Sequence, residues 1–456
     1  MEDIHQRLNG LGVVIPEILF PKPGVDLERW AVIACDQFTQ NRAYWEAAAA
    51  HVGNAPSTLS MIFPEAYLQD SGREERIRRI HTAMTDNLVK GVLAPPRRGC
   101  VYIERATPFH PCRRGIVLAV DLEQYDWTPD SRRLIRTTEG TVPERLPPRV
   151  AIRRGAPLEI PHILLLIDDE EDTLLPGLGE RARRSPPVYR TPLMLDSGSI
   201  QGWFLDGEAE GDFLARGLES LARRAGTRYG REDPAPFLFA VGDGNHSLAT
   251  AKTVWEDYKQ EHTGEGGLAD HPARWALVEV ENIYDPGIGF EPIHRMIFGI
   301  PPGEILRALS VLPGFSSRAA ADRGELSRLV GERGAAKNRL GLMAGKDLTL
   351  IESEAPGLAT NSLQPLLDAL ILSKKAPGPD RDGPAVSIDY IHGEEELFSI
   401  AGASTAAAPA VGILLPPIEK RGLFETVARS GPLPRKSFSM GEAVEKRFYL
   451  ECRRLF

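Results

Sequence analysis

A short polar turn concentrates residue types that can do chemistry. Gly242-Asp-Gly-Asn-His-Ser247 places two glycines beside a carboxylate, an amide, an imidazole and a hydroxyl. Glycine lets the main chain approach a ligand closely, and the polar side chains could donate hydrogen bonds or move a proton around the same point. The pattern is neither the Walker A sequence nor G-x-G-x-x-G, so the turn alone does not define a reaction.

The flanking residues indicate how this turn is held. Phe237-Leu-Phe-Ala-Val241 is a short apolar run typical of a buried strand, and from Leu248 to Tyr258 apolar residues recur on one helix face. The first N–H groups of a helix lack internal partners and carry partial positive charge, so a strand, glycine turn and helix aim spare donors at one point. We expect an anion there, most often a phosphate. Gly244, Asn245 and Ser247 are the expected phosphate-binding residues.

Asp243 and His246 lie among these donors and are candidate catalytic residues. Asp243 could orient a metal ion or an acceptor, accept a proton, or only cap the helix. His246 could stabilise charge or donate a proton, or be an ordinary hydrogen-bonded histidine. Glu139 follows Arg136 in a Thr/Gly-rich stretch and could be the base that prepares a hydroxyl acceptor. The alternative is a loop carboxylate that pairs with Arg145.

Residues elsewhere in the chain could complete the site. Lys436 and Ser437 occupy a Pro-bounded turn and could reach a bound phosphate, or form a solvated basic loop. His294 could join Asp243 as a metal ligand. The acidic run 168–172 could bind Mg²⁺ but is more typical of a solvated acidic edge.

The surrounding elements predict a mixed α/β fold, with mixed sheets and flanking helices, in two intertwined lobes. We expect a main lobe over 1–300 that carries the 242–247 turn, and a second lobe over 301–456 that contributes the 433–441 loop. The apolar patterns that support this class predict buried strands at 29–36 and 162–167, a hairpin from 101–105 and 115–122, and helices at 71–91 and 211–225.

The chain resembles a known protein family. Gly242-Asp-Gly-Asn-His-Ser-Leu-Ala-Thr-Ala-Lys252 is similar to the D-G-H-H-R-x-x-T-A signature of the domain-of-unknown-function-1015 family. The segments 134–142, 160–169 and 433–441 look like the branch of that family with this length. The signature in turn resembles the phosphate-binding box of the ParB–sulfiredoxin–free-serine-kinase superfamily. Members of that superfamily bind nucleotides, and several transfer or hydrolyse phosphoryl groups.

The turn also departs from the family signature. Asn245 replaces its first histidine and Ser247 replaces its arginine, which removes a bidentate phosphate contact. Arg136 or Arg295 could fill that gap. The residues that match the signature are Asp243, Gly244, His246, Thr250 and Ala251.

The resemblance and the turn together favour a nucleotide- or phosphate-binding enzyme, either a phosphotransferase or a nucleotide hydrolase that acts on a small metabolite. ATP, ADP or another nucleotide with Mg²⁺ is the expected cofactor. A sensor that binds a nucleotide or small ligand without turnover is one alternative. A metal-dependent hydrolase that uses His246 and His294 is another.

Composition limits the partners and the compartment. The net charge is −9, whereas a protein whose main task is to bind nucleic acid is usually basic. Four cysteines without a C-x-x-C pair argue against a zinc knuckle and a disulfide framework. The sequence shows neither a Ser-His-Asp elbow nor a His-Glu-x-x-His helix, which disfavours those hydrolase classes. With an acidic N-terminus and only short apolar runs, we expect a cytoplasmic protein without a membrane span, and a homodimer is one option.

Overall fold

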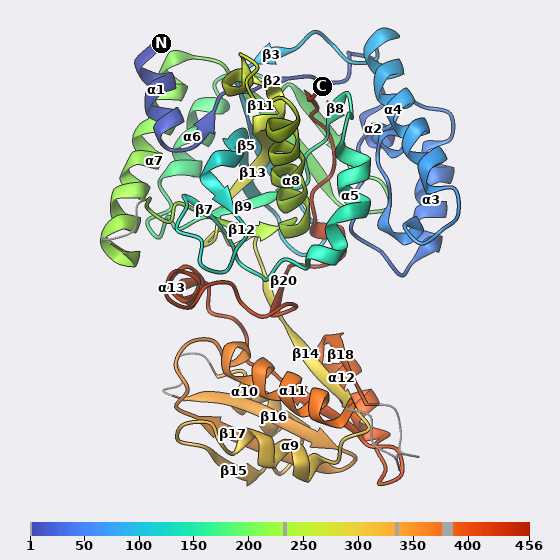
Figure 1. The fold of residues 1–456 in the computed structure, drawn as a ribbon, viewed down its shortest axis with the longest axis vertical. Coiled ribbons are helices and arrows are strands. Elements are labelled where there is room, and N and C mark those ends of the chain that lie inside the picture. Colours follow the sequence, from blue (N-terminus) through green and yellow to red (C-terminus); the bar gives the residue numbers. More distant parts are fainter. Residues whose placement is uncertain (1, 231–234, 333–336, 376–385) are drawn as a thin grey trace. The chain divides into compact units, whose positions relative to one another are not determined.

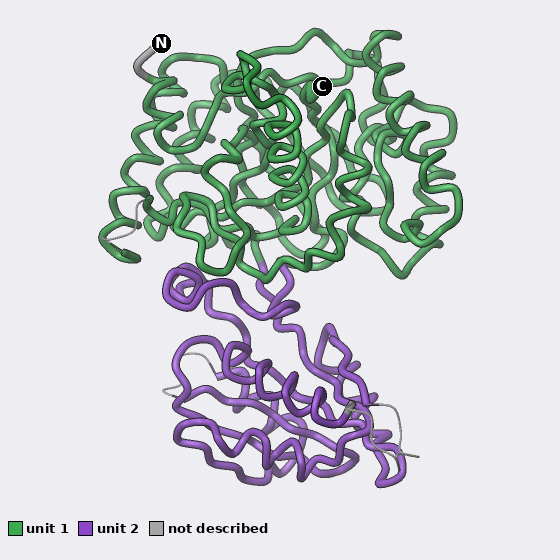
Figure 2. Tube along the Cα trace, viewed as in Figure 1, with its two compact units in different colours: residues 1–288, 441–456 green, residues 289–440 purple. Residues whose placement is uncertain are grey.

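The computed structural model describes residues 2–230, 235–332, 337–375 and 386–456, and the chain forms two compact units. Unit 1 comprises residues 1–288 and 441–456, and unit 2 comprises residues 289–440 (Figure 2). Unit 2 is therefore an insertion within the sequence of unit 1. Residues 441–456, which the sequence-based division places in the second lobe, belong to unit 1.

A mixed sheet of ten strands forms the centre of the described part of unit 1 (Figure 1). Its strands are β1 (Val13–Val14), β4 (Cys100–Ala106), β5 (Arg113–Asp121), β6 (Tyr125–Asp126), β7 (Ile135–Thr137), β9 (Leu164–Ile167), β10 (Tyr189–Pro192), β11 (Ser199–Leu205), β12 (Phe239–Asp243) and β13 (Trp275–Asn282). The order is β10-β11-β4-β5-β13-β9-β12-β7-β6, and β1 pairs with β5. β13 is parallel to β9, and β7 is parallel to both β6 and β12, whereas β9 and β12 are antiparallel. The predicted mixed α/β class is confirmed.

Helices cover this sheet, and the predicted amphipathic helix after the glycine turn is present. It is α8 (Asn245–Glu261), whose apolar side chains Leu248, Ala251 and Trp255 are buried. The other helices of unit 1 are α1 (Glu2–Gly10), α2 (Leu27–Trp30), α3 (Arg42–Val52), α4 (Arg73–Val89), α5 (Leu146–Arg153), α6 (Leu174–Ala182) and α7 (Glu208–Tyr229).

Short elements complete unit 1. Two further strand pairs, β2 (Glu17–Ile18) with β3 (Arg97–Arg98) and β8 (Leu158–Glu159) with β21 (Arg453–Arg454), lie outside the main sheet. The 3₁₀ turns are η1 (Thr58–Met61), η2 (Glu65–Tyr67), η3 (Leu122–Gln124), η4 (Pro143–Arg145), η5 (Leu268–Asp270), η6 (Pro272–Arg274) and η7 (Ala443–Glu445).

The C-terminal segment is threaded into unit 1 beside residues that lie far away in the sequence. Tyr449 N–H donates to the Val32 carbonyl at 2.9 Å, and Ala34 N–H donates to the Arg447 carbonyl at 2.8 Å. The predicted strand over 29–36 is wrong. Its start belongs to α2, because the Asp26 carboxylate caps that helix, and residues 31–34 make these isolated bonds to the C-terminal segment instead of joining a sheet.

Unit 2 is built on a sheet of seven strands among its described residues, in the order β15-β17-β16-β19-β14-β18, with β20 paired to β14. The strands are β14 (Phe290–Phe298), β15 (Ser316–Ala319), β16 (Asn338–Ala344), β17 (Asp347–Ser353), β18 (Ser387–His392), β19 (Ala410–Leu414) and β20 (Phe438–Met440). The helices are α9 (Pro302–Leu309), α10 (Arg323–Val330), α11 (Ala359–Lys375), α12 (Glu394–Gly402) and α13 (Lys420–Ser430).

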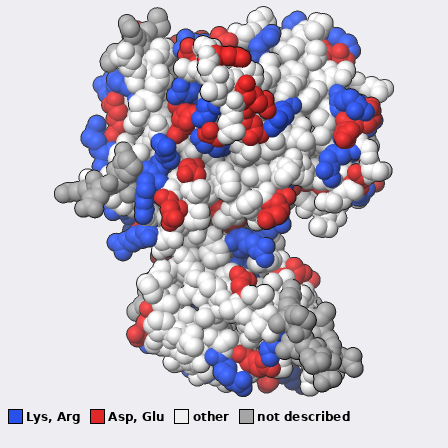
Figure 3. Space-filling model, viewed as in Figure 1, with Lys and Arg blue, Asp and Glu red and all other residues white. Residues whose placement is uncertain are grey.

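Alternation along the strands gives unit 2 a core on each face of its sheet. Ile297 joins the apolar cluster with α9 and α11, whereas the adjacent Met296 joins the cluster with α10 and α12. Among the described helices of both units, none has the length and apolar character that crossing a bilayer requires. On the face shown in Figure 3, basic and acidic side chains of unit 1 are interspersed.

Candidate functional site

The turn between β12 and α8 depends on glycine at position 244. Gly244 has φ 79° and ψ 28°, the left-handed conformation that side chains disfavour. A β-carbon added there would also lie 3.2 Å from Ile163 Cα. Leu248 N–H donates the first helical hydrogen bond, to the Gly244 carbonyl at 3.0 Å. The amides of Asn245, His246 and Ser247 therefore precede the helical ladder, as the first amides of any helix do.

A buried lysine from the C-terminal segment faces this turn. Lys446 Nζ lies 3.2 Å from Asp243 Oδ2, and the lysine side chain is only 7% exposed. Burial tends to raise the pKa of Asp36, but the opposing effects of His162, a hydrogen bond from Gln37 and the charge of Lys446 are larger, so the pKa of Asp36 is lowered. The Lys446 ammonium thus pairs with Asp243 directly before α8, and its charge also acts on Asp36.

A second chain of contacts begins at Ser247. Its Oγ lies 2.5 Å from His162 Nε2, and the other ring nitrogen, Nδ1, lies 2.9 Å from the Tyr449 hydroxyl. That hydroxyl accepts the backbone N–H of Cys35 at 2.9 Å. Asp36 Oδ2 lies 3.8 Å from His162 Nε2. These contacts join three separate parts of the sequence around one imidazole.

A cavity of about 130 Å³ lies beside this chain of contacts. Polar groups of Ser247, His162 and Tyr449 line it, together with the ion pair between Glu65 and Arg149. Burial raises the pKa of Glu65, and the Arg149 charge offsets part of that effect. Mostly apolar walls with a few convergent polar groups are typical of small-molecule sites. The apolar lining comes from Met61, Ile62, Phe63, Leu68, Met84, Ile152, Ala156, Leu158 and Ile160.

Two predicted site residues hold a loop against α8. Asn245 Oδ1 accepts the hydroxyl of Thr137, whose oxygen also lies 2.6 Å from the Glu139 carbonyl. His246 Nε2 accepts the backbone N–H of Val142 at 3.3 Å. The structure therefore brings Asn245, His246 and the backbone carbonyl of Glu139 together near the start of α8. Their roles in phosphate binding and catalysis stay predictions.

Arg136, a predicted phosphate-binding residue, is buried in β7. Its guanidinium donates to the carbonyls of Arg133 at 3.0 Å and Ala235 at 3.4 Å, and it lies 4.8 Å from the ring centre of Phe237. Successive residues of a strand point to opposite faces, and the next residue, Thr137, contacts α8. The described contacts of Arg136 thus lie away from α8, and its role as a replacement for the signature arginine stays a prediction.

His294, the second predicted metal ligand, belongs to unit 2. It is buried, and its Nδ1 accepts the Leu415 N–H at 3.1 Å. Burial, followed by the nearby Arg295 and His392, lowers its pKa to about 4. Over the described residues, no group of three or more His, Cys, Asp or Glu side chains is arranged to hold a metal ion. The pairing of Asp243 with His294 at a metal stays a prediction.

Lys436 and Ser437 also belong to unit 2. Lys436 is exposed, and its carbonyl accepts from Arg295 Nη1 at 2.9 Å. Ser437 is buried, and its hydroxyl donates to the Pro434 carbonyl at 2.6 Å. Arg295 is itself buried, with Nε 2.7 Å from Gln364 Oε1. The structure places these three candidates together in unit 2, and their part in a phosphate site stays a prediction.

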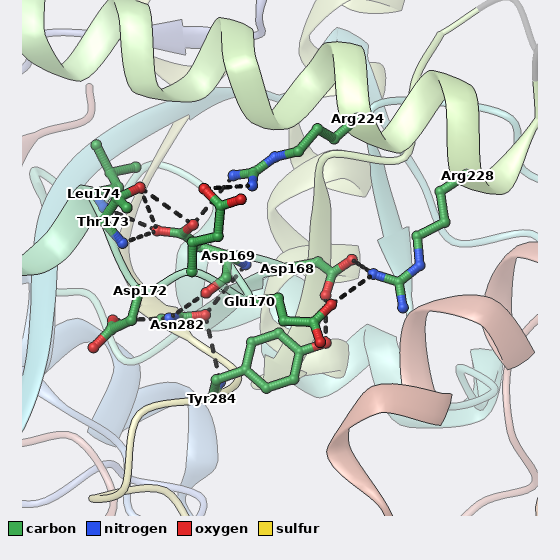
Figure 4. Close-up of polar contacts among 11 residues, drawn as sticks. Asp168, Asp169, Glu170, Asp172, Thr173, Leu174, Arg224, Arg228, Asn282 and Tyr284 are labelled. Carbon is green, nitrogen blue, oxygen red and sulfur yellow. Dashed lines mark hydrogen bonds and ion pairs between the residues drawn. The ribbon is translucent and has the colours of Figure 1, made fainter.

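The acidic run 168–172 is only partly the solvated edge that its composition favours, since Glu170 and Glu171 are exposed but its three aspartates are not. Asp169 is fully buried, and its carboxylate accepts the backbone N–H groups of Thr173 and Leu174, both at 2.8 Å (Figure 4). Arg224 lies 3.2 Å from the same carboxylate. Asp169 therefore satisfies amides at the start of α6.

The neighbouring carboxylates of this run also have protein partners. Asp168 accepts the hydroxyl of Tyr284 at 2.7 Å and pairs with Arg228 at 3.2 Å (Figure 4). It also accepts the hydroxyl of Tyr229. Asp172 accepts from Asn282 Nδ2 at 3.0 Å. The expectation of a solvated edge is wrong for Asp168, Asp169 and Asp172, because aromatic hydroxyls, amides and arginines contact their carboxylates, whereas Glu170 and Glu171 are exposed.

Sequence reasoning did not select four residues that the structure places around the turn. His162 lies in the segment 160–169, which resembles the family, and Asp36 follows an apolar run. The sequence pattern that could have identified Asp36 is its position as a polar residue directly after an apolar run. Lys446 and Tyr449 have no local pattern that marks them, because only the threading of the C-terminal segment places them near α8.

A protein-family model matches residues 19–370 of the chain. The chain belongs to the DUF1015 family. The family is described as proteins of unknown function, and the match confirms the resemblance seen in the signature around Asp243. No curated protein matches the sequence.

Solved structures similar to this DUF1015 protein are distant. A conserved hypothetical protein from Pyrococcus furiosus is 11% identical, with 73% of this chain and 90% of that chain covered and a TM-score of 0.33. A free serine kinase in complex with AMP is 10% identical, with 74% and 92% covered and a TM-score of 0.37. SbnI with a C-terminal truncation, from Staphylococcus aureus, is 11% identical, with 71% and 82% covered and a TM-score of 0.34. We base no functional argument on similarities this low.

Proposed function

We propose that unit 1 binds a nucleotide or another phosphorylated small metabolite, with a phosphate at the first turn of α8, and transfers or hydrolyses its phosphoryl group. The observation that carries this proposal is the buried ammonium of Lys446, 3.2 Å from Asp243 at a helix N-terminus that follows a glycine turn. Both the ammonium and the helix dipole attract an anion to this point.

The groups around Lys446 support distinct roles. In this proposal the amides of Asn245 and Ser247 bind phosphate oxygens, and Lys446 neutralises charge that develops on them. Asp243 orients the acceptor. The apolar cavity beside Ser247 receives the organic part of the ligand, although its volume of about 130 Å³ fits only part of a nucleotide.

Mg²⁺ fits this arrangement as an ion that arrives with the nucleotide. Such an ion uses one or two protein carboxylates together with phosphate oxygens, so a cluster of three protein ligands is not required. Asp36 and Asp243, which both interact with Lys446, are the residues that would hold it. The ion would neutralise phosphate charge.

The test is calorimetric titration of the full chain with ATP, ADP, AMP and inorganic phosphate, each with and without Mg²⁺. Lys446→Met should weaken binding at least about tenfold, since a charge-assisted contact is lost. The matched control is Lys259→Met, which removes another ion-paired lysine but lies on a later turn of α8. Absence of binding by all four ligands, or equal losses in both variants, would contradict the proposal.

A turnover assay distinguishes the proposed enzyme from a non-catalytic ligand sensor. Phosphorus NMR of the full chain with ATP and a mixture of small hydroxylated metabolites should show loss of ATP and appearance of a new phosphorus signal. Binding without any such change favours the non-catalytic ligand sensor.

A further inference from the structure

Ser247 is the third residue of α8, in the first turn of the helix that follows β12 and the Gly244 turn. Its Oγ lies 2.5 Å from His162 Nε2, within the reach that a general base needs. In the resembled signature this position is an arginine, so the serine is a feature of this chain. The contact joins residues 85 positions apart and has no sequence motif.

The contacts of His162 orient its ring for this role. Nδ1 lies 2.9 Å from the Tyr449 hydroxyl, whose oxygen also accepts the backbone N–H of Cys35 at 2.9 Å. A tyrosine oxygen has two lone pairs, so it can accept Nδ1–H as well as that amide. In that tautomer Nε2 carries no proton and accepts the Ser247 hydroxyl. This arrangement meets the requirement that a third group orients the base.

The Asp36 carboxylate also lies beside the ring, with its Oδ2 3.8 Å from His162 Nε2.

Ser247 is also open to a small electrophile. Ser247, Thr250 and His162 line the same cavity of about 130 Å³, whose remaining walls are largely apolar. The serine is half-buried, so a reagent can reach it while the walls limit water.

We infer that Ser247 is a nucleophile activated by His162, and that phosphoryl transfer in unit 1 passes through a phosphoserine at residue 247. The phosphoryl part of this inference rests on the proposed function. The substrate class is a phosphate ester or anhydride, and the acceptor is water or a metabolite hydroxyl.

The two half-reactions balance. In the first, Ser247 Oγ bonds to phosphorus, the serine proton moves to His162 Nε2, and the bond from phosphorus to the leaving oxygen breaks with its electron pair on that oxygen. His162 then gives the proton to the leaving group. In the second, water or the acceptor hydroxyl attacks phosphorus and loses a proton to His162. The bond from phosphorus to Ser247 Oγ breaks, and that oxygen recovers the proton from His162.

The first experiment tests nucleophilicity without a nucleotide. The full chain is incubated with diisopropyl fluorophosphate, which reacts with an activated serine and releases fluoride, and the adduct is located by tandem mass spectrometry. We expect one adduct, on Ser247, absent in Ser247→Ala and formed at least about 100-fold more slowly in His162→Gln, because a general base contributes that much. The control Thr253→Ala removes a hydroxyl of α8 outside the cavity and should label like the parent.

Chemical rescue excludes a merely structural role of the histidine. In His162→Gly, added imidazole should restore labelling in proportion to its concentration. Labelling that is unchanged in His162→Gln, or an adduct only at other residues, overturns the inference.

The second experiment tests the phosphoryl step and separates the two proposals. The full chain is mixed with radiolabelled ATP or with p-nitrophenyl phosphate and quenched in acid, and phosphoserine at residue 247 is the expected result. Phosphate binding and turnover without an adduct on Ser247 overturn the nucleophile and leave the proposed function standing. Fluorophosphate labelling of Ser247 without affinity for any phosphate compound contradicts the proposed function and the phosphoserine, and leaves only the activated serine.

Discussion

β9 has a polar cluster at each end, and the two clusters differ in what their side chains bind. At the Asp168 end, backbone amides, tyrosine hydroxyls and arginines occupy the carboxylates of the 168–172 run. At the other end, His162 leads to Ser247 and a cavity. We call the second group the α8 cluster; it comprises Asp36, His162, Asp243, Ser247, Lys446 and Tyr449.

The comparison shows that the density of acidic residues is a poor guide to a ligand site. The 168–172 run is the more acidic of the two, yet Asp169 acts as internal structure because it is fully buried and accepts the Thr173 and Leu174 amides at the start of α6. The α8 cluster has fewer charges, but they converge on a helix N-terminus beside a cavity. Substitutions in the first cluster should therefore change stability most, and substitutions in the second should change ligand binding more than folding.

The largest stability effect should come from Asp169→Ala. It leaves the Thr173 and Leu174 amides and Arg224 without their carboxylate, which we expect to cost about 3 kcal/mol of unfolding free energy. Urea unfolding measures it. Glu171→Ala is the control, since Glu171 is exposed and its pair with Arg224 should be worth less than about 0.5 kcal/mol. Equal losses in both variants would erase the distinction between the two clusters.

Gly244→Ala should have the next largest effect, a loss of about 2 kcal/mol of unfolding free energy. The left-handed conformation and the close Ile163 backbone both disfavour a side chain. Gly264→Ala separates the two causes, because Gly264 has φ 90° but no atom within 4 Å of an added β-carbon. The control Gly264→Ala should lose about 1 kcal/mol of unfolding free energy, as measured by urea unfolding. A Gly244→Ala loss no greater than the control's would show that Ile163 exerts no constraint.

A double-mutant cycle on Lys446 and Asp243 should give a coupling free energy of about 1–2 kcal/mol for unfolding. Each single variant, Lys446→Met or Asp243→Asn, leaves a largely buried charge without its partner. The double variant should therefore lose less unfolding free energy than the sum of the two singles. Additive losses in this double-mutant cycle would mean that the ion pair does not hold the α8 cluster together.

The smallest effect should be the pH dependence due to Asp36. Its lowered pKa means that the folded state favours the ionised form, so its contribution is complete at neutral pH and is lost as pH falls through the folded pKa. The stability difference between the parent and Asp36→Asn, below about 1 kcal/mol at pH 7, should therefore shrink as pH falls below about 4. Thermal unfolding from pH 3 to 7 measures it. A difference that grows on acidification would reverse the assigned sign.

The sequence correctly predicted elements whose structure depends on neighbouring residues in the chain. The glycines of 242–247 and the apolar face from Leu248 to Trp255 correctly indicated a strand, a turn and a helix, because each depends on neighbours in the chain. The same reasoning failed for 29–36, where the cap at Asp26 and bonds to residues 447–449 override an apolar run.

The rest of the α8 cluster depends on pairing between distant segments. Lys446 and Tyr449 come near α8 because the C-terminal segment bonds to residues 32–34, which no spacing in the sequence reveals. Similarly, the partners of Asp168 are Tyr229, Arg228 and Tyr284, at least 60 positions away. Acidic composition alone could not show that they would cover it.

The insertion of unit 2 sets an order of events during synthesis. A ribosome must translate all of residues 289–440 before it makes the segment that carries Lys446 and Tyr449. Until then, the nascent chain lacks both the ammonium beside Asp243 and the phenol beside His162. The α8 cluster is therefore assembled last, after translation has passed the inserted unit, and no ligand that depends on Lys446 can be held by the incomplete chain.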